Sequence, residues 1–223
     1  MRNISIILIV LFMLSADTRI QAQAAEPAPK PTAPSTIFRD SDGNLISNNE
    51  FVDIRMANFH YKDATVTKIL DDGTIEFRLQ KIPQEGMSAP NFTAKDIHGE
   101  EISFADLKGK VVVLNFWFIG CPACIAETPK LNELKTKFAD DDDVVFIALT
   151  YEPTGKVKHY LSREKFDYRV AGDAQTALDM FVFSGYPKNI VIGRDGKIVY
   201  WRSPIHAWEK FESVIKTELS KKE

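Results

Sequence analysis

Cysteine and histidine are scarce in this sequence. The 223 residues include only 2 cysteines and 4 histidines, which excludes a scaffold held together by several disulfides. A zinc site would need two ligands besides a cysteine pair, and the histidines stand singly along the chain, at His60, His98, His159 and His206. We therefore expect no metal and no other cofactor, and half of a zinc site is only a minor alternative for the cysteine pair.

The sequence also lacks a strong charge of one sign and a long apolar run. Its formal net charge is -3, so neither nucleic acid nor an anionic membrane surface is indicated as a partner. The apolar run from Ile4 to Leu14 is interrupted only by Ser5, and it is much shorter than the roughly 20 residues that a membrane-spanning helix needs. With 44% hydrophobic and 26% charged residues, the composition is that of an ordinary globular protein.

Residues 1–24 have the features of a secretory signal peptide. Arg2 provides a positive start, the apolar run follows, and Ala22-Gln23-Ala24 supplies small residues for a cleavage site. We therefore expect an exported protein of the periplasm or cell envelope that is soluble after signal cleavage. An uncleaved N-terminal membrane anchor is the less favoured alternative.

Two segments are expected between the signal peptide and the main domain. Residues 25–36 contain four prolines among small and polar residues, which is typical of an extended linker. A disordered N-terminus of the mature protein, with no role as a spacer, is an equal alternative. Residues 37–85, here called the accessory segment, include strand-like runs at 64–70 and 74–80 on either side of Asp71-Asp72-Gly73, and this pattern predicts a β-hairpin. The accessory segment is too small for a core of its own. We expect it to pack onto the following domain and, since it has no catalytic motif, to take no part in the chemistry.

From residue 86 to residue 223, strand-like and helix-like patterns alternate, which indicates an α/β fold. The continuous apolar run Val111–Trp117 predicts a central strand, and it is followed by Gly120, Cys121 and a helix. Further strands are expected at 144–149, 168–171, 189–192 and 197–201, and further helices at 156–164, 174–181 and 207–219. The cysteines are thus expected at a strand-to-helix turn.

Cys121 and Cys124 are separated only by Pro122 and Ala123. A disulfide that closes so short a loop contributes only about 2 kcal/mol by chain entropy, so the pair is better suited to redox chemistry than to structure. At the start of a helix, unpaired amide groups and the helix dipole stabilise a thiolate. Pro122 fits the first helical turn because its missing N–H costs nothing there. We therefore expect a redox-active disulfide in which Cys121 is the reactive thiol.

Glu127 lies three residues after Cys124, on the same face of the predicted helix. It could exchange a proton with the sulfur of Cys124. It could equally be a surface residue that pairs with Lys130 on the next turn. Helix geometry alone leaves both interpretations open.

Together, these features resemble the TlpA/ResA-like branch of the thioredoxin superfamily. The similarity covers roughly residues 87–219, and its motifs occur in the order of the family. They are Asn115-Phe116-Trp117, Cys121 to Cys124, Glu127, Pro129, Gly185-Tyr186-Pro187, Ile190-Val191-Ile192 and Asp195-Gly196-Lys197. The resemblance implies an α/β, thioredoxin-like fold with a central mixed sheet flanked by helices. The hairpin predicted in the accessory segment adds a small N-terminal β-rich extension.

The resemblance also implies the roles of individual residues. Cys121 matches the cysteine that attacks a substrate disulfide, Cys124 matches the resolving cysteine, and Glu127 matches the acidic residue that ResA-like proteins carry after their motif. Pro187 is expected to be a cis-proline that faces the disulfide. Substrate binding is expected at Tyr186, Pro187 and Trp117.

The function implied by the resemblance is thiol:disulfide exchange with exported proteins. We expect a reductase that acts in cytochrome c maturation or envelope redox homeostasis, with disulfide-bearing exported proteins as substrates and a membrane thiol donor as partner. A peroxiredoxin-like thiol peroxidase is the enzymatic alternative. Those enzymes need a Thr within a P-x-x-x-T-x-x-C stretch, whereas Trp117-Phe118-Ile119-Gly120 precede Cys121 here. A non-enzymatic thioredoxin-fold binding module is the third possibility.

Overall fold

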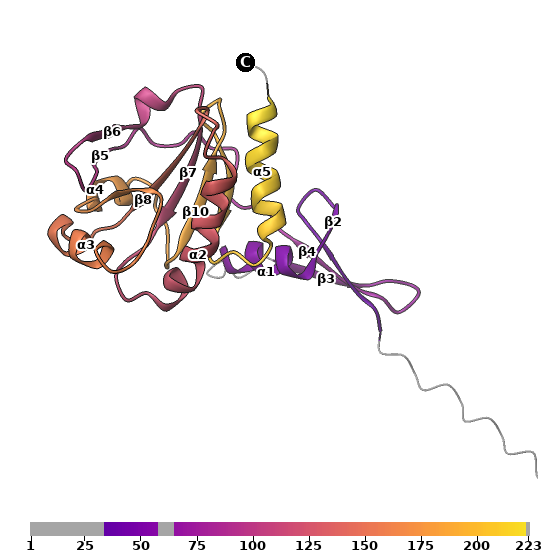
Figure 1. Ribbon diagram of the computed structural model, residues 1–223. Coiled ribbons are helices and arrows are strands. Elements are labelled where there is room, and N and C mark those ends of the chain that lie inside the picture. Colours follow the sequence, from indigo (N-terminus) through magenta and orange to yellow (C-terminus); the bar gives the residue numbers. More distant parts are fainter. Residues whose placement is uncertain (1–33, 58–64, 222–223) are drawn as a thin grey trace, which may run out of the picture. The chain divides into compact units, whose positions relative to one another are not determined.

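The computed structural model describes residues 34–57 and 65–221 (Figure 1). The predicted signal peptide and most of the predicted linker lie outside these residues, as does His60. Within the described residues, no helix is both long enough and apolar enough to cross a membrane.

A five-stranded mixed sheet forms the centre of the fold. Its strands are β7 (Val111–Phe116), β8 (Val144–Leu149), β9 (Arg169–Ala171), β10 (Lys188–Ile192) and β11 (Ile198–Arg202). They are arranged in the order β11-β10-β7-β8-β9. β7, β8 and β9 run parallel, whereas β10 is antiparallel to both β7 and β11. The predicted mixed sheet is confirmed, and the strands lie close to their expected bounds.

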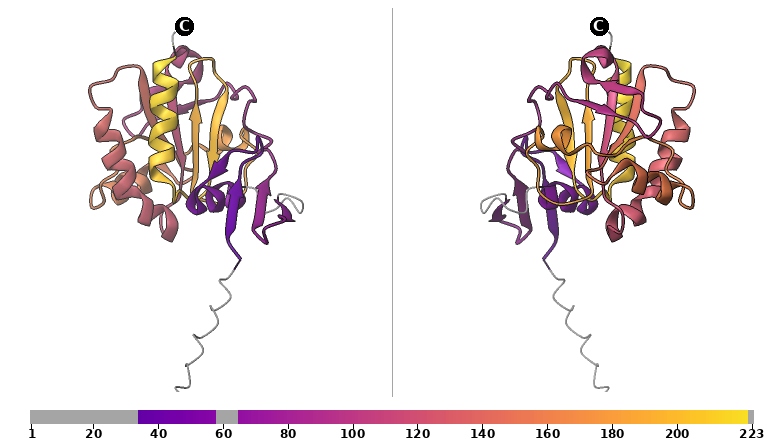
Figure 2. Two further views of the ribbon diagram at one scale, coloured as in Figure 1. Left: turned by 90° about the vertical axis from the view of Figure 1, so that its right-hand side faces the viewer. Right: turned by 90° about the vertical axis from the view of Figure 1, so that its left-hand side faces the viewer.

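Different helices cover the two faces of this sheet. The helices of the main domain are α2 (Pro122–Lys137), α3 (Thr154–Leu161), α4 (Gln175–Asp179) and α5 (Trp208–Ser220). Because side chains alternate along a strand, Val113 of β7 joins the apolar cluster that contains Ile215 of α5, whereas Leu114 joins the cluster that contains Leu178 of α4. Accordingly, α5 (yellow) lies in front of the sheet in the left view of Figure 2 and behind it in the right view.

The segment before β7 adds two small sheets. A short antiparallel hairpin is formed by β5 (Thr93–Lys95) and β6 (Glu101–Ser103), and a 3-10 helix follows at Phe104–Leu107. The accessory segment contributes β1 (Thr36–Arg39), β2 (Leu45–Ile46), α1 (Asn48–Ala57), β3 (Thr65–Ile69) and β4 (Ile75–Leu79). β3 and β4 pair antiparallel, which confirms the predicted hairpin. β1 pairs parallel with β4, so Thr36, assigned to the linker from the sequence, is the first residue of a strand.

Helix α1 is the main element that the sequence analysis did not predict. The backbone N–H of Glu50 donates to Ser47 Oγ at 3.1 Å, which caps the start of the helix. Ser47 and Glu50 have the spacing of a capping box. This sequence signal would have indicated the helix.

The accessory segment shares the core of the main domain. Four of its residues are buried in the same apolar cluster as Leu114 of β7: Ile54, Ala57, Leu79 and Ile82. Lys210 of α5 also lies 3.2 Å from Glu50 of α1. The expected packing onto the main domain is therefore confirmed. α1 lies next to the C-terminal end of β11 and the start of α5.

Candidate active site

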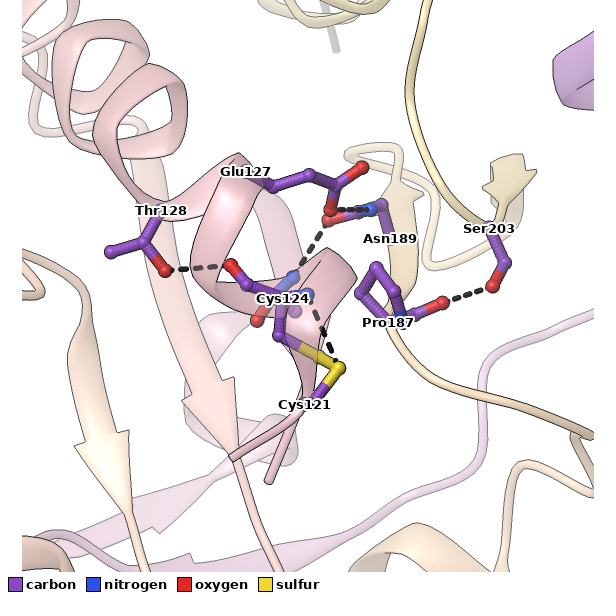
Figure 3. Close-up of a disulfide and its surroundings, with 8 residues drawn as sticks. Cys121, Cys124, Glu127, Thr128, Pro187, Asn189 and Ser203 are labelled. Atoms are coloured by element: carbon purple, nitrogen blue, oxygen red, sulfur yellow. Dashed lines mark hydrogen bonds between the residues drawn. A yellow bond between two sulfur atoms is a disulfide. The ribbon is translucent and has the colours of Figure 1, made fainter. Parts of the chain in front are cut away.

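Cys121 and Cys124 form a disulfide at the start of α2 (Figure 3). The S–S bond is 2.05 Å and the Cα atoms are 5.3 Å apart. Cys121 is the N-cap residue of α2, Pro122 follows in the first turn, and the backbone N–H of Cys124 donates to Cys121 Sγ at 3.1 Å. The predicted strand-to-helix placement is confirmed, since β7 ends at Phe116 and α2 begins at Pro122.

The two cysteines differ in their position at the start of α2 more than in their exposure. Cys121 is 2% exposed and Cys124 is 4% exposed, so neither sulfur is freely accessible in the disulfide form. Only Cys121 occupies the N-cap, where its sulfur accepts a backbone hydrogen bond, and the first turn of α2 contains no acidic residue. This position favours negative charge on the sulfur of Cys121.

The backbone conformation of the active-site turn favours glycine at position 120. Its φ angle is +88°, a left-handed conformation that glycine adopts without the steric cost that a Cβ would bring. A Cβ built at Gly120 would meet no atom within 4 Å. Backbone conformation, and not lack of space, therefore accounts for the glycine at this position.

Pro187 lies beside the disulfide (Figure 3), and the Tyr186–Pro187 peptide bond is cis. The prediction of a cis-proline that faces the disulfide is thus confirmed. The hydroxyl of Ser203 donates a hydrogen bond to the carbonyl of Pro187. The loop after β11 therefore contacts the proline turn directly.

The two predicted aromatic substrate contacts have different surroundings. The Tyr186 ring is partly buried and packs edge-on against Phe118 at 5.3 Å and Phe183 at 5.2 Å between ring centroids. Trp117, in contrast, is only 4% exposed and packs against Tyr160 and Phe166. The side chain of Trp117 therefore lies in the core with the two cysteines, and its contact with substrate stays a prediction.

Glu127 is buried, with only 5% of the residue exposed. Its Oε2 accepts a hydrogen bond from Asn189 Nδ2 at 3.0 Å, and its Oε1 accepts one from the backbone N–H of Ile205. Burial raises the pKa of Glu127 from 4.5 to about 7, and these two hydrogen bonds partly oppose that rise. Lys130, the alternative partner, instead places its Nζ over the Trp208 ring. The structure therefore excludes the surface ion pair and favours the interpretation in which Glu127 exchanges a proton near neutral pH.

A pair of buried asparagines completes the surroundings of Glu127. Asn115 of β7 and Asn189 of β10 are register partners in the sheet, and Asn115 Nδ2 donates to Asn189 Oδ1 at 2.8 Å. This bond leaves the Asn189 amide group directed at Glu127 (Figure 3). Asn115 belongs to the motif Asn115-Phe116-Trp117, whereas Asn189 is part of none of the sequence motifs. The available signal was the polar Asn189 before the apolar run Ile190–Ile192 of β10.

The alternative of half a zinc site gains no support from the described part of the chain. Within residues 34–57 and 65–221, no group of three or more His, Cys, Asp or Glu side chains could hold a metal ion. The two sulfurs are bonded to each other.

Comparison with known proteins places these features in a family. The sequence profile of the Redoxin family matches residues 84–216. The thiol-disulfide oxidoreductase ResA of Bacillus thuringiensis (strain Al Hakam) is 37% identical over 118 residues, which cover 52% of this chain and 68% of that protein. The thioredoxin domain of a thiol-disulfide oxidoreductase from Bacteroides vulgatus is 27% identical, with a TM-score of 0.53, and the match covers 60% of this chain and 97% of that domain.

A second solved structure supports the fold alone. A thioredoxin-family thiol:disulfide interchange protein from Chlorobium tepidum is 23% identical, with a TM-score of 0.54, over 63% of this chain and 100% of that chain. The Redoxin match spans more than half of the sequence and includes Cys121 and Cys124. The chain therefore belongs to the Redoxin family, and it is a TlpA/ResA-like thiol:disulfide oxidoreductase of the thioredoxin superfamily.

Proposed function

We propose that this oxidoreductase works as a reductase of disulfides in exported proteins, with Cys121 as the attacking thiol and Cys124 as the resolving thiol. One observation carries the assignment of roles: Cys121 is the N-cap residue of α2, and its Sγ accepts a hydrogen bond from the backbone N–H of Cys124. A helix N-terminus stabilises a thiolate. Cys121 is therefore the better nucleophile of the two once the disulfide is reduced.

The reaction begins from the reduced protein. The Cys121 thiolate attacks one sulfur of the substrate disulfide, which forms a mixed disulfide and releases the other substrate sulfur as a thiolate. Cys124 then attacks Cys121 Sγ, which releases the second substrate thiol and closes the Cys121–Cys124 disulfide. Two electrons pass from the protein to the substrate, and a thiol donor must supply two electrons to regenerate the dithiol.

Glu127 is proposed to accept the proton of Cys124 during resolution. The two residues lie one turn apart on α2, and the pKa of Glu127 is about 7 because the carboxyl group is buried. A base whose pKa is close to the working pH is suited to proton transfer. The resulting Cys124 thiolate is the species that can attack the mixed disulfide.

Tyr186 and Pro187 are proposed to bind the substrate next to the disulfide. Pro187 lies beside the two sulfurs, and its carbonyl already accepts from Ser203. The backbone of Tyr186 is therefore the part of this turn that we assign to a substrate strand. The exposed ring of Tyr151 lies 6.0 Å from the partly buried ring of Tyr186, measured between centroids, and extends the same face.

The cellular setting is part of the proposal. The signal-like features of residues 1–24 support export to the periplasm or cell envelope, and a membrane thiol donor would then supply the electrons. The resemblance to the TlpA/ResA-like family implies a substrate in cytochrome c maturation, with general envelope redox homeostasis as the broader setting. The direction of electron flow between the protein and these partners depends on the reduction potential of the Cys121–Cys124 pair.

The proposal is tested by disulfide reduction and by trapping of substrates. The protein reduced with dithiothreitol should reduce insulin, and both Cys121→Ala and Cys124→Ala should abolish turnover. Cys124→Ala should accumulate mixed disulfides with exported proteins in vivo, whereas Cys121→Ala should not. Peroxide consumption by Cys121 alone, together with no trapped partner in Cys124→Ala, would identify a thiol peroxidase instead. A reduction potential close to that of a strong oxidant would reverse the proposed direction.

A further inference from the structure

The loop between β11 and α5, residues 203–207, contacts the active site at two points. The Ser203 hydroxyl donates to the carbonyl of Pro187. Two residues on, the backbone N–H of Ile205 donates to Glu127 Oε1. The position of this loop therefore decides whether a backbone donor is available to the buried carboxylate.

The same loop is held from its other side by Asp53 of α1. Asp53 is 1% exposed, and both of its carboxylate oxygens are occupied. Oδ2 accepts from the backbone N–H of Ala207 at 2.9 Å, and Oδ1 accepts from the backbone N–H of His206 at 2.8 Å and lies 2.6 Å from His206 Nδ1. Hydrogen bonds to a buried carboxylate are among the stronger ones in proteins.

Asp53 also supplies a cap that α5 lacks. Ala207, the N-cap residue of α5, makes no side-chain capping hydrogen bond, and an unsatisfied helix N-terminus favours a negative charge. The Asp53 carboxylate meets that need from a helix that lies more than 150 residues earlier in the chain. Its position is fixed by its neighbours Ile54 and Ala57, which are buried in the core of the main domain.

A second contact of the accessory segment secures the residue before the loop. Glu85 Oε1 lies 2.5 Å from Arg202 Nη1 and accepts from the backbone N–H of Trp201 at 3.2 Å. Arg202 is buried, and its guanidinium lies over the Tyr200 ring, 4.7 Å from the centroid. The accessory segment thus fixes the chain on both sides of Ser203 and Ile205, which contact Pro187 and Glu127.

We propose that Asp53 is a positioning residue of the active site, which fixes the loop 203–207 and through it directs the Ile205 N–H at Glu127. The inference deepens the proposed function, since the value of placing Glu127 depends on its role in proton transfer. Asp53 lies outside residues 84–216, the part matched by the Redoxin family. The accessory segment, which we expected from its sequence to take no part in the chemistry, thereby completes the surroundings of a family residue.

Loss of Asp53 should lower the pKa of Glu127, because two effects act in the same direction. Release of the loop admits water and weakens the burial that is the largest cause of the raised pKa, and removal of the Asp53 charge takes away a repulsion that raises it further. Loss of the Ile205 hydrogen bond acts in the opposite direction but is a smaller cause than burial. The charged and titratable groups that face Glu127 are Asp53, His206, Tyr168 and Tyr200.

The test is the titration of Glu127 itself in the full-length, disulfide-bonded protein. The carboxyl 13C resonance of Glu127, assigned by its absence in Glu127→Gln, should titrate near pH 7 in the unmodified protein. Asp53→Ala should lower this midpoint by about one pH unit or more. Asp53→Asn retains an oxygen that can accept from the backbone amides, so it should give a smaller decrease. This second variant also gives a result if Asp53→Ala fails to fold.

Lys210→Met is the matched control, because Lys210 joins the same two helices through Glu50 and not through Asp53. Its Glu127 midpoint should be unchanged. An unchanged midpoint in folded Asp53→Ala and Asp53→Asn, or an equal decrease in Lys210→Met, overturns the inference. The pH profile of insulin reduction is measured alongside. A shifted midpoint with an unshifted profile supports the positioning by Asp53 and rejects the proposed role of Glu127, so the two failures are distinguishable.

Discussion

Asn189 Nδ2 donates a hydrogen bond of 3.0 Å to Glu127 Oε2, although the two residues are 62 positions apart in the sequence. Asn189 is oriented by Asn115 on the neighbouring strand, so the amide presents a donor to the carboxylate. The same carboxylate is removed from water by its burial on α2. The pKa of Glu127 is therefore set by a balance between burial, which favours the protonated form, and fixed donors, which favour the ionised form.

Replacement of Asn189 by Leu should raise the pKa of Glu127 above about 7. The substitution removes a donor to the ionised carboxylate and replaces it with an apolar group, and both changes disfavour the charge. The direction is opposite to that expected for Asp53→Ala. Titration of the Glu127 carboxyl group by 13C NMR measures it, and a fall in the midpoint would show that the substitution opens the site to water.

Glu127 should make the disulfide form less stable as the pH rises. Its pKa is about 7 in the folded protein against an ordinary value of 4.5, so the folded state binds the proton more tightly than the unfolded state does. The stability that this difference provides is complete below about pH 4.5 and is lost as the pH rises to about 7. Its full size is on the order of 3 kcal/mol, taken as an upper figure.

Urea unfolding of the unmodified protein and of Glu127→Gln, at several pH values between about 4 and 8, measures this effect. The free energy of unfolding of the unmodified protein should fall relative to that of the variant across this interval, since the glutamine does not titrate. Because all other titratable groups are shared, the comparison isolates position 127. Parallel curves for the two proteins would mean that the pKa of Glu127 is the same in the folded and unfolded states.

Cys121 should react with iodoacetamide at a lower pH than Cys124 in the reduced protein. The N-cap position stabilises the Cys121 thiolate, whereas Cys124 lies within the first turn and has no such contact. Mass spectrometry of the singly alkylated protein identifies the site. A single inflection near the ordinary pKa of about 8.5, with equal labelling of both thiols, would contradict the assignment of Cys121 as nucleophile.

Gly120→Ala should destabilise the protein by about 1–2 kcal/mol, the cost of placing a Cβ in a left-handed conformation. The effect comes from the backbone alone, because φ is +88° and a Cβ would meet no atom within 4 Å. Gly120→Asn should cost less, since asparagine tolerates this conformation better. Urea unfolding compares the three proteins. Equal stability of all three would show that the turn relaxes to another conformation.

Local spacing was enough to predict the disulfide and its setting. The apolar run at Val111–Trp117, the two-residue gap between Cys121 and Cys124, and the turn residues of the hairpins each act within about a dozen positions, so sequence patterns report them directly. The position of Cys121 at a helix start follows from the same local signals. Gly185-Tyr186-Pro187 added the proline turn by resemblance, and its place beside the disulfide is confirmed.

What only the tertiary structure decided is the state of Glu127 and the part played by the accessory segment. The helix pattern left Glu127 either buried or on the surface, because the partners that settle the question, Asn189 and Ile205, are 62 and 78 residues away. Asp53 is 153 residues from His206, whose backbone it holds. Burial, and the pKa shift that follows from it, arise only when such distant segments come together in the fold. A local sequence pattern cannot predict such contacts.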